Sequence, residues 1–324
     1  MPLPTGADQH VNSLLTNLSV MFVNDPGKFV APQAFPPVPV MKQTGIIPQF
    51  DRADFLRDEA QVRAPASESA GGGYRVDNTA TYNCLEYAYH KDIADQDRAN
   101  ADDPYAPDRN AVAYLNQKRL LREEVQWASN YFTTGVWTGS STATDLVAGT
   151  DFTAWDDAAS DIVGIIDNEA EAIEAATAMY PNLLVLNRAG WNTVKNHPDI
   201  VDRVKHVSDG PVTPDIVARL LGIERILVGA AVKATSGEGA STTTTAAIFG
   251  KHALLCYAAP TPSLELPSAG YTFRWTPVDG GEGGAAVSTY RMDLRRADRH
   301  EIDFAFDQKV ISAVCGAFFQ NVCS

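Results

Sequence analysis

Residues 29–50, FVAPQAFPPVPVMKQTGIIPQF, combine five prolines with many large apolar side chains. Each proline fixes φ, lacks a backbone N–H donor and pushes the preceding residue toward extended geometry. The segment can therefore form neither a helix nor the middle of a sheet, and we predict an extended arm without regular structure. A disordered tail is normally poor in aromatic and branched residues, so some surface must cover the apolar ones. They are Phe29, Val30, Phe35, Val38, Val40, Met41, Ile46, Ile47 and Phe50.

The bulk composition is that of an ordinary globular protein. With 324 residues, of which 45% are hydrophobic and 20% charged, the chain can bury the core of one large domain or of two joined domains. The formal charge of −14 argues against a protein whose main function is to bind nucleic acid. No stretch approaches about 18 consecutive apolar residues, and the start MPLPTGADQHVNSLL lacks a signal-peptide pattern. We therefore expect no contact with a membrane.

The sequence lacks the local motifs of an enzyme or a metal protein. Its six histidines never occur at metal-binding spacings, and the glycine-rich stretches SGEGAS and GGEGGAA do not match a phosphate-binding loop. The acidic run 95–103 lacks the glycine and the closing Glu of a calcium loop, and no GxSxG motif occurs. His197 precedes a proline at a helix break, where we expect a capping or packing role. We predict no catalytic residue, no metal and no cofactor.

The four cysteines are widely spaced and form no CxxC pair. They lie in apolar surroundings such as HALLCYAA and ISAVCGAFF, so we predict buried, reduced thiols of a cytoplasmic protein. They are Cys84, Cys256, Cys315 and Cys323.

Residues 51–93 are predicted to form a long two-stranded hairpin. Leu85, Tyr87 and Tyr89 alternate with polar or small residues, which is the period of a strand with two different faces. Three consecutive glycines at 71–73 supply a flexible tip. Such a hairpin is marginal alone in water, so it needs an external surface to lie on.

A long helix and an α/β region follow. Residues 108–133 contain no Gly or Pro and place apolar residues at helical spacing. Residues from about 150 to 260 alternate between helix and strand, with a short buried strand at 181–187 and a helix that starts at Thr213 and Pro214. Residues 290–319 return to strand patterning and are expected to rejoin the sheet beside the long helix.

The stretch RMDLRRADRH interleaves four arginines with acidic residues. Alternating signs on adjacent strands favour salt bridges, within the chain or to a neighbour, over contact with DNA. The arginines are Arg291, Arg295, Arg296 and Arg299.

Several motifs, taken in order, resemble one family. KFVAPQAFPPVPVMKQTGIIPQFDRADFLRDEAQVRAPAS resembles the N-terminal arm and the start of the extended loop in one branch of the major capsid proteins of tailed bacteriophages, which have the Hong Kong 97-like fold. REEVQWASNYF resembles the end of their spine helix. PNLLVLNRAGWNTVKNHPDIVDRVKH and PDIVARLLGIERILVGAAV resemble their axial subdomain. The resemblance covers nearly the whole chain, and the order and spacing of the motifs make it specific.

The resemblance implies an α+β fold in four parts. These are an N-terminal arm at 1–50, an extended β-hairpin loop at 51–93, a peripheral subdomain at 94–154 and 286–324 with a spine helix at 108–133, and an α/β axial subdomain at 155–285. The prolines would keep the arm off its own subunit, so that arm and loop contact neighbouring subunits. Phe35→Asp should then leave the subunit folded but block shell formation. The expected assembly contacts are Phe29, Phe35, Val38, Val40, Ile46, Phe50, Arg63, Gly71, Gly72, Gly73, Tyr87, Tyr89, Arg295 and Arg296.

The resemblance also implies partners. Copies of the chain would form pentamers and hexamers that tile an icosahedral shell in the bacterial cytoplasm, enclosing double-stranded DNA through non-specific contacts in the virion. About twenty residues precede the arm, which favours a separate scaffolding protein, and a portal and a decoration protein are further expected partners. The loop has no Lys before Lys91, which argues against isopeptide cross-links.

Two other interpretations stay open. An encapsulin-like compartment shares the fold and would enclose a cargo enzyme rather than a genome. A soluble α/β enzyme, suggested by residues 155–260, would be a monomer or small oligomer with a ligand pocket at the strand ends.

Overall fold

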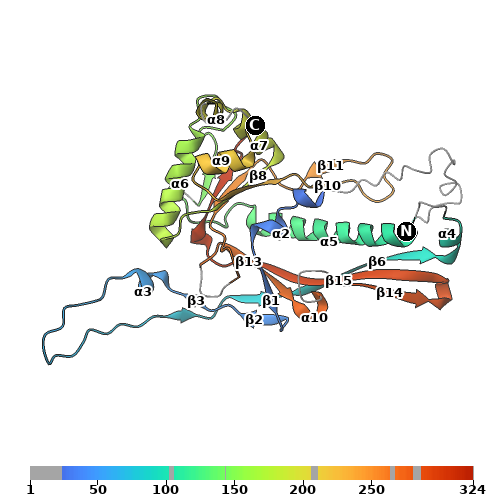
Figure 1. Ribbon diagram of the computed structural model, residues 1–324, viewed down its shortest axis with the longest axis horizontal. Coiled ribbons are helices and arrows are strands. Elements are labelled where there is room, and N and C mark those ends of the chain that lie inside the picture. The colour runs from blue at the N-terminus through green and yellow to red at the C-terminus, as the bar shows by residue number, and fades with distance from the viewer. Residues whose placement is uncertain are drawn as a thin grey trace.

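The computed structural model describes residues 24–101, 106–142, 144–205, 211–262, 267–279 and 286–323. These residues build two five-stranded sheets, three two-stranded ribbons and a long helix that crosses the molecule (Figure 1). A thin loop extends away from this body at the lower left of the view. Residues 1–23 of the predicted arm and most of the GGEGGAA stretch lie outside the described residues.

The first sheet is organised around one long strand, β15 (Ala297–Val310). Strand β6 (Leu85–Ala94) pairs antiparallel with one edge of β15, while β14 (Ala286–Met292) and β13 (Gly270–Trp275) share the opposite edge. Strand β1 (Pro37–Val40) pairs in parallel with β13 and completes the sheet.

Helix α5 (Pro107–Tyr131) lies along the first sheet (Figure 1). Pro107 stands in its first turn, where the missing N–H breaks no helical hydrogen bond. Ile302, Phe304 and Phe306, which alternate along β15, pack with Leu115 of α5 in one buried cluster. The helix predicted at 108–133 thus matches the observed one, which is about 37 Å long at 1.5 Å per residue.

The second sheet has the strand order β7-β16-β12-β8-β9 and collects segments that are far apart in the chain. Strand β12 is antiparallel to both of its neighbours, whereas β8 and β9 are parallel, as are β16 and β7. The bounds are β7 Asp145–Val147, β8 Leu183–Asn187, β9 Arg225–Gly229, β12 Ala253–Cys256 and β16 Gly316–Gln320.

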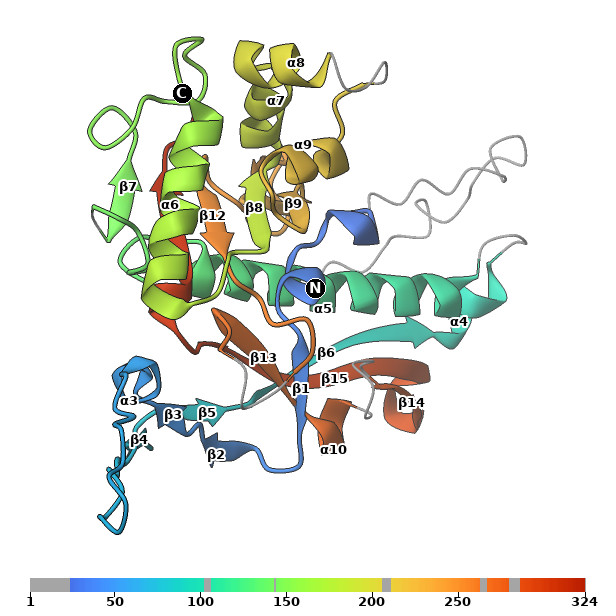
Figure 2. The same ribbon diagram turned by 60° about the vertical axis from the view of Figure 1, so that its left-hand side comes forward.

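Each face of the second sheet packs into a different core. Leu184 and Leu186 of β8 face a cluster shared with four helices, whereas Leu183 and Val185 face a cluster shared with the end of α5. Because both faces are buried, the strand reads as a continuous apolar run, as the sequence predicts. Figure 2 shows the four helices around this sheet. They are α6 (Ile162–Thr177), α7 (Arg188–Asn196), α8 (Pro198–Val204) and α9 (Pro214–Leu220).

The arm is more ordered than predicted. It contains a 3-10 turn η1 (Pro26–Lys28), a short helix α2 (Ala31–Ala34) and the strands β1 and β2 (Thr44–Ile46). Proline is tolerated in the first turn of a helix and on an edge strand, which are the positions of the prolines in α2 and β1. The prediction of an arm without regular structure is therefore wrong.

The arm also packs on its own subunit. Phe29 and Phe35 are each 1% exposed, and the ring of Phe35 contacts Trp127 and Tyr131 of α5. In this subunit the two phenylalanines are therefore buried by their own chain, whereas the sequence predicted that neighbouring subunits would cover them. Phe35→Asp would place a charge inside the subunit core, so we now expect this variant to destabilise the subunit itself.

The extended loop starts and ends earlier than the predicted 51–93. Its base consists of two ribbons, β2 with β5 (Thr81–Asn83) and β3 (Gln49–Phe50) with β4 (Val76–Asp77), and α3 (Arg52–Leu56) follows β3. Strand β6, predicted as part of this hairpin, belongs to the first sheet. The alternation of apolar and polar residues in β6 is compatible with a strand of the hairpin and with a strand of the first sheet.

The tip of the loop is a turn in which the N–H of Ser67 donates to the carbonyl oxygen of Ala64. Gly71, Gly72 and Gly73 therefore lie on the returning branch, and their placement at the tip is wrong. Ala66 adopts the left-handed φ of 61° within this turn, a conformation that sequence rules reserve mainly for glycine.

The two sheets cross the predicted subdomain boundaries. Strand β13 falls within the predicted axial range 155–285 but lies in the first sheet, while β7 and β16 fall in the predicted peripheral ranges but lie in the second. The chain passes between the sheets several times, and sequence patterns report the type of an element rather than its sheet. The remaining elements are α4 (Asp95–Ala99), β10 (Val232–Ala234), β11 (Thr245–Ala247), α10 (Thr276–Asp279), η2 (Asp293–Arg295) and η3 (Ala313–Cys315).

Candidate assembly site

Three aromatic rings form an exposed cluster at the base of the extended loop. Phe50, Phe55 and Tyr74 contact one another with ring centroids 5.7 to 5.8 Å apart. Their exposed fractions are 47%, 61% and 64%. Contiguous exposed apolar surface typically marks an interaction site. We call these three residues the loop aromatic cluster; only Phe50 is among the contacts predicted from the sequence.

Charged side chains hold the two branches of the loop opposite each other. Asp51 caps α3 by accepting a hydrogen bond from the N–H of Ala53 at 2.9 Å. Arg75, on the returning branch, contacts Asp51 at 2.5 Å and Asp54 at 3.3 Å. Hydrogen bonds from the backbone and guanidinium of Arg75 hold the pKa of Asp54 below its usual range. Arg75 is largely exposed, so these pairs add little stability, but they join the two branches of the loop that carry the rings.

Arg52 connects the base of the loop to the second sheet's helices. Its Nη1 donates to the carbonyl oxygen of Ala176, near the end of α6, at 2.9 Å. A cation is favoured at this end of a helix because the terminal carbonyl groups carry partial negative charge. At the tip, Arg63 donates to the carbonyl oxygen of Ser67 at 2.6 Å, and the residues around it are exposed.

Tyrosines and cations line the junction of α5 and β6. The hydroxyl oxygens of Tyr89 and Tyr114 lie 3.1 Å apart, and Lys118 Nζ lies 5.2 Å from the centre of the Tyr114 ring. The guanidinium of Arg122 lies 4.8 Å from the centre of the Tyr87 ring. Tyr87 also packs on the aromatic rings of β15 and is half-buried, whereas Tyr89 is exposed.

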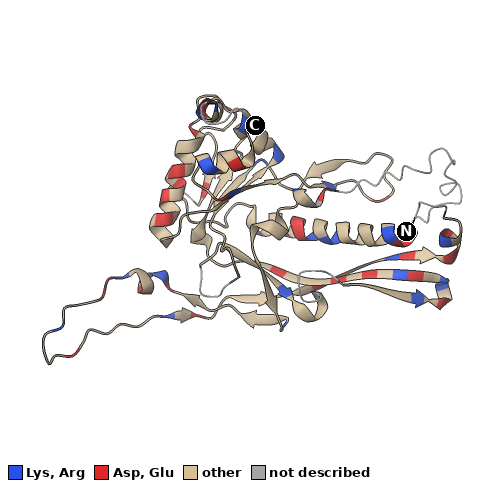
Figure 3. Cartoon of the chain, viewed as in Figure 1, with Lys and Arg blue, Asp and Glu red and all other residues tan. Residues whose placement is uncertain are grey.

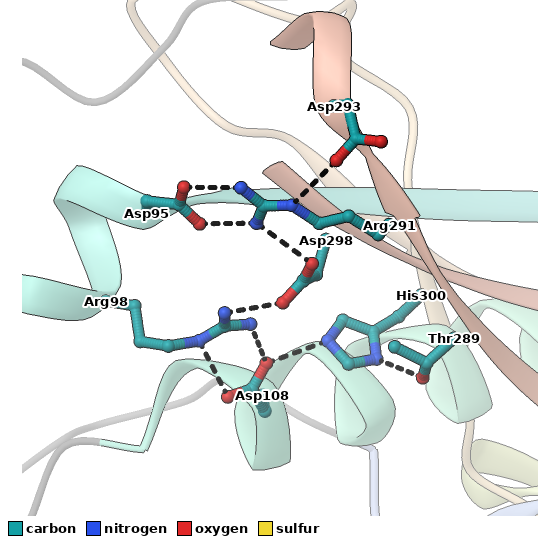
Figure 4. A network of polar contacts seen from close by, with 8 residues as sticks. All are labelled: Asp95, Arg98, Asp108, Thr289, Arg291, Asp293, Asp298 and His300. Carbon is teal, nitrogen blue, oxygen red and sulfur yellow. Dashed lines mark hydrogen bonds and ion pairs between the residues drawn. The ribbon is translucent and has the colours of Figure 1, made fainter. Parts of the chain in front are cut away.

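An ionic network joins α4, α5, β14 and β15 at one end of the first sheet (Figure 4). Arg98 contacts Asp108 at 2.7 Å and Asp298 at 2.5 Å. Arg291 contacts Asp95 at 2.5 Å and Asp298 at 3.1 Å. Hydrogen bonds from these arginines hold the pKa values of the three carboxyls below their usual range.

The other predicted arginines lie nearby. Arg299 and Arg295 contact Asp92 of β6 at 2.6 and 3.3 Å. With Arg291, these contacts confirm that the basic stretch forms salt bridges within the chain, and Figure 3 shows acidic and basic residues mixed along β15. Arg296 has a left-handed φ of 46°, and its carbonyl oxygen accepts from the N–H of Asp95 at 3.0 Å. Arg295 and Arg296 are exposed.

The remaining predicted contacts differ in burial. Val38 and Val40 are half-buried against a small cluster beneath β1. Ile46 on β2 is exposed, as is Met41 before it at 77%, which the sequence did not single out as a contact. These two residues are exposed apolar side chains outside the loop aromatic cluster.

A shallow pocket of about 360 Å³ lies beside α7 and α8. His197 is already engaged there, since its Nδ1 accepts from the N–H of Asp199 at 3.3 Å and its Nε2 lies 3.1 Å from the carbonyl oxygen of Asp157. The expected capping role of His197 is thus confirmed. The pocket is lined by Trp155, Asp156, Ala158, Asn192, Thr193, Asn196, His197 and Pro198.

Within the described residues, no group of three or more His, Cys, Asp and Glu side chains is placed to hold a metal ion. In the same part of the chain, no helix is long and apolar enough to cross a membrane. The four cysteines are buried and none forms a disulfide, as predicted. Burial raises the pKa of the Cys315 thiol, which keeps it protonated.

Comparisons with known proteins point to one structural class. No protein-family model matches the chain. The chain is 28% identical over 277 residues to a major capsid protein of Burkholderia phage BcepMu, a match that covers 82% of this chain and 83% of that protein.

Solved structures are similar over nearly the whole chain. A phage-related protein of Bordetella bronchiseptica matches with a TM-score of 0.69 and 21% identity, covering 92% of this chain and 93% of that one. The capsid of cyanophage P-SCSP1u matches with a TM-score of 0.58 and 14% sequence identity. The match covers 98% of this chain and 94% of that one. An encapsulin of Synechococcus elongatus matches with a TM-score of 0.53 and 11% sequence identity. The match covers 100% of this chain and 98% of that one. The chain has the α+β, Hong Kong 97-like fold of phage capsid proteins, and the predicted resemblance is confirmed.

Proposed function

We propose that this chain is the major capsid protein of a tailed phage, a structural subunit that assembles into an icosahedral shell. The observation that carries the proposal is the loop aromatic cluster, exposed on a loop that extends from the body (Figure 1). A shell subunit buries such rings against its neighbour, whereas a monomer leaves them in water. The fold and the similarity to a phage major capsid protein support the same function.

In the proposed shell, the loop of one subunit lies on the next subunit within a pentamer or hexamer. Phe50, Phe55 and Tyr74 act as the anchors, because aromatic side chains in the centre of an interface carry most of its binding energy. The exposed Met41 and Ile46 are proposed as separate apolar contacts. The exposed Tyr89, Arg295 and Arg296 are proposed as polar contacts at the edges of the subunit.

The further partners follow from the proposed function. The shell assembles in the bacterial cytoplasm on a separate scaffolding protein, incorporates a portal, and encloses double-stranded DNA by non-specific contact. A decoration protein on the outside is a further proposed partner. The net charge of −14 fits a container that does not bind its genome tightly.

A cargo-enclosing compartment is the second candidate, because the encapsulin matches nearly as well as the cyanophage capsid. The sequence similarity to a phage protein favours the phage shell. An enzyme has less support, since the ring nitrogens of His197 beside the pocket are engaged in contacts with the backbone.

Sedimentation and electron microscopy of the purified full chain test the proposal. The chain is produced alone and together with a co-expressed scaffolding protein, and the pelleted material is imaged. Closed shells, or rings of five and six subunits, are expected. A monomer or dimer under every condition would contradict the proposal. Shells that contain a protein cargo and no DNA, when isolated from the native host, would favour the compartment.

A further inference from the structure

Helix α2 of the arm is held at both ends by charged side chains from different parts of the subunit. At its start, the N–H groups of Val30 and Ala31 donate to the two carboxylate oxygens of Glu124, each at 2.8 Å. At its end, Nη2 of Arg225 donates to the carbonyl oxygen of Ala34 at 3.2 Å. Glu124 belongs to α5 and Arg225 to β9, so the arm links the helix of the first sheet to the second sheet.

Glu124 differs from the acid beside it. Glu123 is buried but is neutralised by Arg119 at 2.7 Å and Arg274 at 2.9 Å. Glu124 is 0% exposed, and among the described residues its hydrogen-bond partners are the two backbone N–H groups of the arm. A buried carboxylate without a cation is costly in its ionised form.

The surrounding charges leave this cost uncompensated. Burial raises the pKa of Glu124 to about 7, the two N–H donors oppose this, and the nearby charge of Glu123 adds to it. Of the nearby cations, Arg119 and Arg274 are engaged with Glu123, and Arg225 lies at the other end of α2. A glutamate in an unfolded chain titrates near pH 4.3. The stabilisation from Glu124 is therefore full below about pH 4.3 and is lost as the pH rises toward 7.

We propose that Glu124 is a proton-controlled latch that holds the arm on the body of the subunit. In its protonated form it retains the start of α2 against α5. In its ionised form the desolvation cost of the buried charge favours local opening, in which the segment from Phe29 to Phe35 leaves its site. The inference concerns the unassembled subunit and goes beyond the proposed function.

Hydrogen–deuterium exchange of the full-length, unassembled chain tests the latch. Peptides covering residues 24–36 are followed by mass spectrometry between pH 5.5 and pH 8, with each rate divided by the rate of an unstructured peptide at the same pH. The protection of this segment should fall roughly tenfold or more across the range. Peptides from β8 and β12, which lie in the core of the second sheet, should keep their protection.

Glu124→Gln cannot ionise, so its arm protection should stay constant across the same range, although at a lower level because the amide nitrogen cannot accept one of the two N–H groups. Glu171→Gln, on the exposed face of α6, is the matched control and should behave as the wild type. Wild-type protection that does not change with pH overturns the proposal without any variant. Unchanged pH dependence in Glu124→Gln overturns it as well. Because exchange is measured before assembly, a failure to form shells bears on the proposed function and not on the latch.

Discussion

The ring of Phe35 meets the ring of Tyr131 edge-on, with centroids 4.7 Å apart and an angle of 62° between the planes. Such pairs stabilise a core beyond the burial of their area. We predict that Phe35→Ala lowers the free energy of unfolding of the isolated subunit by about 3–5 kcal/mol. Urea denaturation followed by fluorescence would measure the change.

The matched control for Phe35 is Met41→Ala, in the same arm but at an exposed position. It should change the free energy of unfolding by less than about 0.5 kcal/mol. Equal effects of the two substitutions would mean that the arm does not pack on α5 in solution.

The loop aromatic cluster should matter for assembly and not for folding. We predict that Phe55→Ser leaves the urea midpoint of the subunit unchanged, because the ring is largely exposed in the isolated chain. The yield of sedimenting shells or rings should fall at least about tenfold, since interface anchors typically contribute more than 2 kcal/mol. Glu68→Ser, on an exposed part of the same loop, is the control. Wild-type yields from Phe55→Ser would remove this cluster from the proposed contact.

The buried pair of Glu123 and Arg274, 2.9 Å apart, gives a third prediction. Arg274→Met leaves a buried carboxylate with one of its two cations, so the free energy of unfolding should fall by about 3–5 kcal/mol. Adding Glu123→Leu should recover part of this loss, because the uncompensated charge is then removed. The exposed pair of Arg203 and Asp199 serves as the comparison, and Arg203→Met should cost less than about 1 kcal/mol. Similar losses in both single variants would contradict the assignment of Arg274 to the core.

Acid should weaken the ionic network of Figure 4 in a defined direction. Arg98 and Arg291 hold the pKa of Asp298 below its usual range, and Arg291 does the same for Asp95. The stabilisation from these carboxylates is full above the unfolded pKa of about 3.9 and is lost as the pH falls through their lower folded values. This pH range lies below the range in which Glu124 titrates. The stabilisation from Glu124 also changes in the opposite direction, because it is lost as the pH rises. Urea midpoints measured from pH 5 down to pH 2 would separate the two.

Asp298→Asn tests the source of the acid effect. This variant should show a shallower loss of stability below pH 4 than the wild type, and added salt should reduce the difference because the pairs are partly exposed to solvent. Asp58→Asn, in the extended loop, should follow the wild-type curve. A variant curve that parallels the wild type would assign the acid sensitivity to other carboxyls.

Elements with their own periodic signal could be predicted from the sequence. Helix α5 has uninterrupted helical spacing, and the apolar run of β8 indicates burial on both faces. The three residues of β7 carry no comparable signal, because its place beside β16 depends on the tertiary fold. Phe35 illustrates the same limit of sequence-based prediction. The composition of the arm indicates that this ring must be buried, but it does not indicate whether its own subunit or a neighbouring subunit buries it.

The candidate site was harder to predict than the fold. Phe55 and Tyr74 are separated by 18 intervening residues, most of them polar or small, and no local periodicity links the two rings. They meet because Arg75 joins Asp51 and Asp54 across the two branches of the loop. No periodicity reports a contact of this kind, so the cluster becomes visible only once the loop has folded back on itself.

Strand β16 lies between β7 and β12, inside the second sheet, although it comes from residues 316–320 at the end of the chain. The ribosome must therefore have translated residues 316–320 before this sheet can close. At about 5–20 residues per second, synthesis of the chain takes tens of seconds, during which the arm and the loop already exist without a complete body. A prematurely terminated product lacks the strand that joins the two halves of the sheet. The order of synthesis thus restricts closure of the second sheet to chains that include β16.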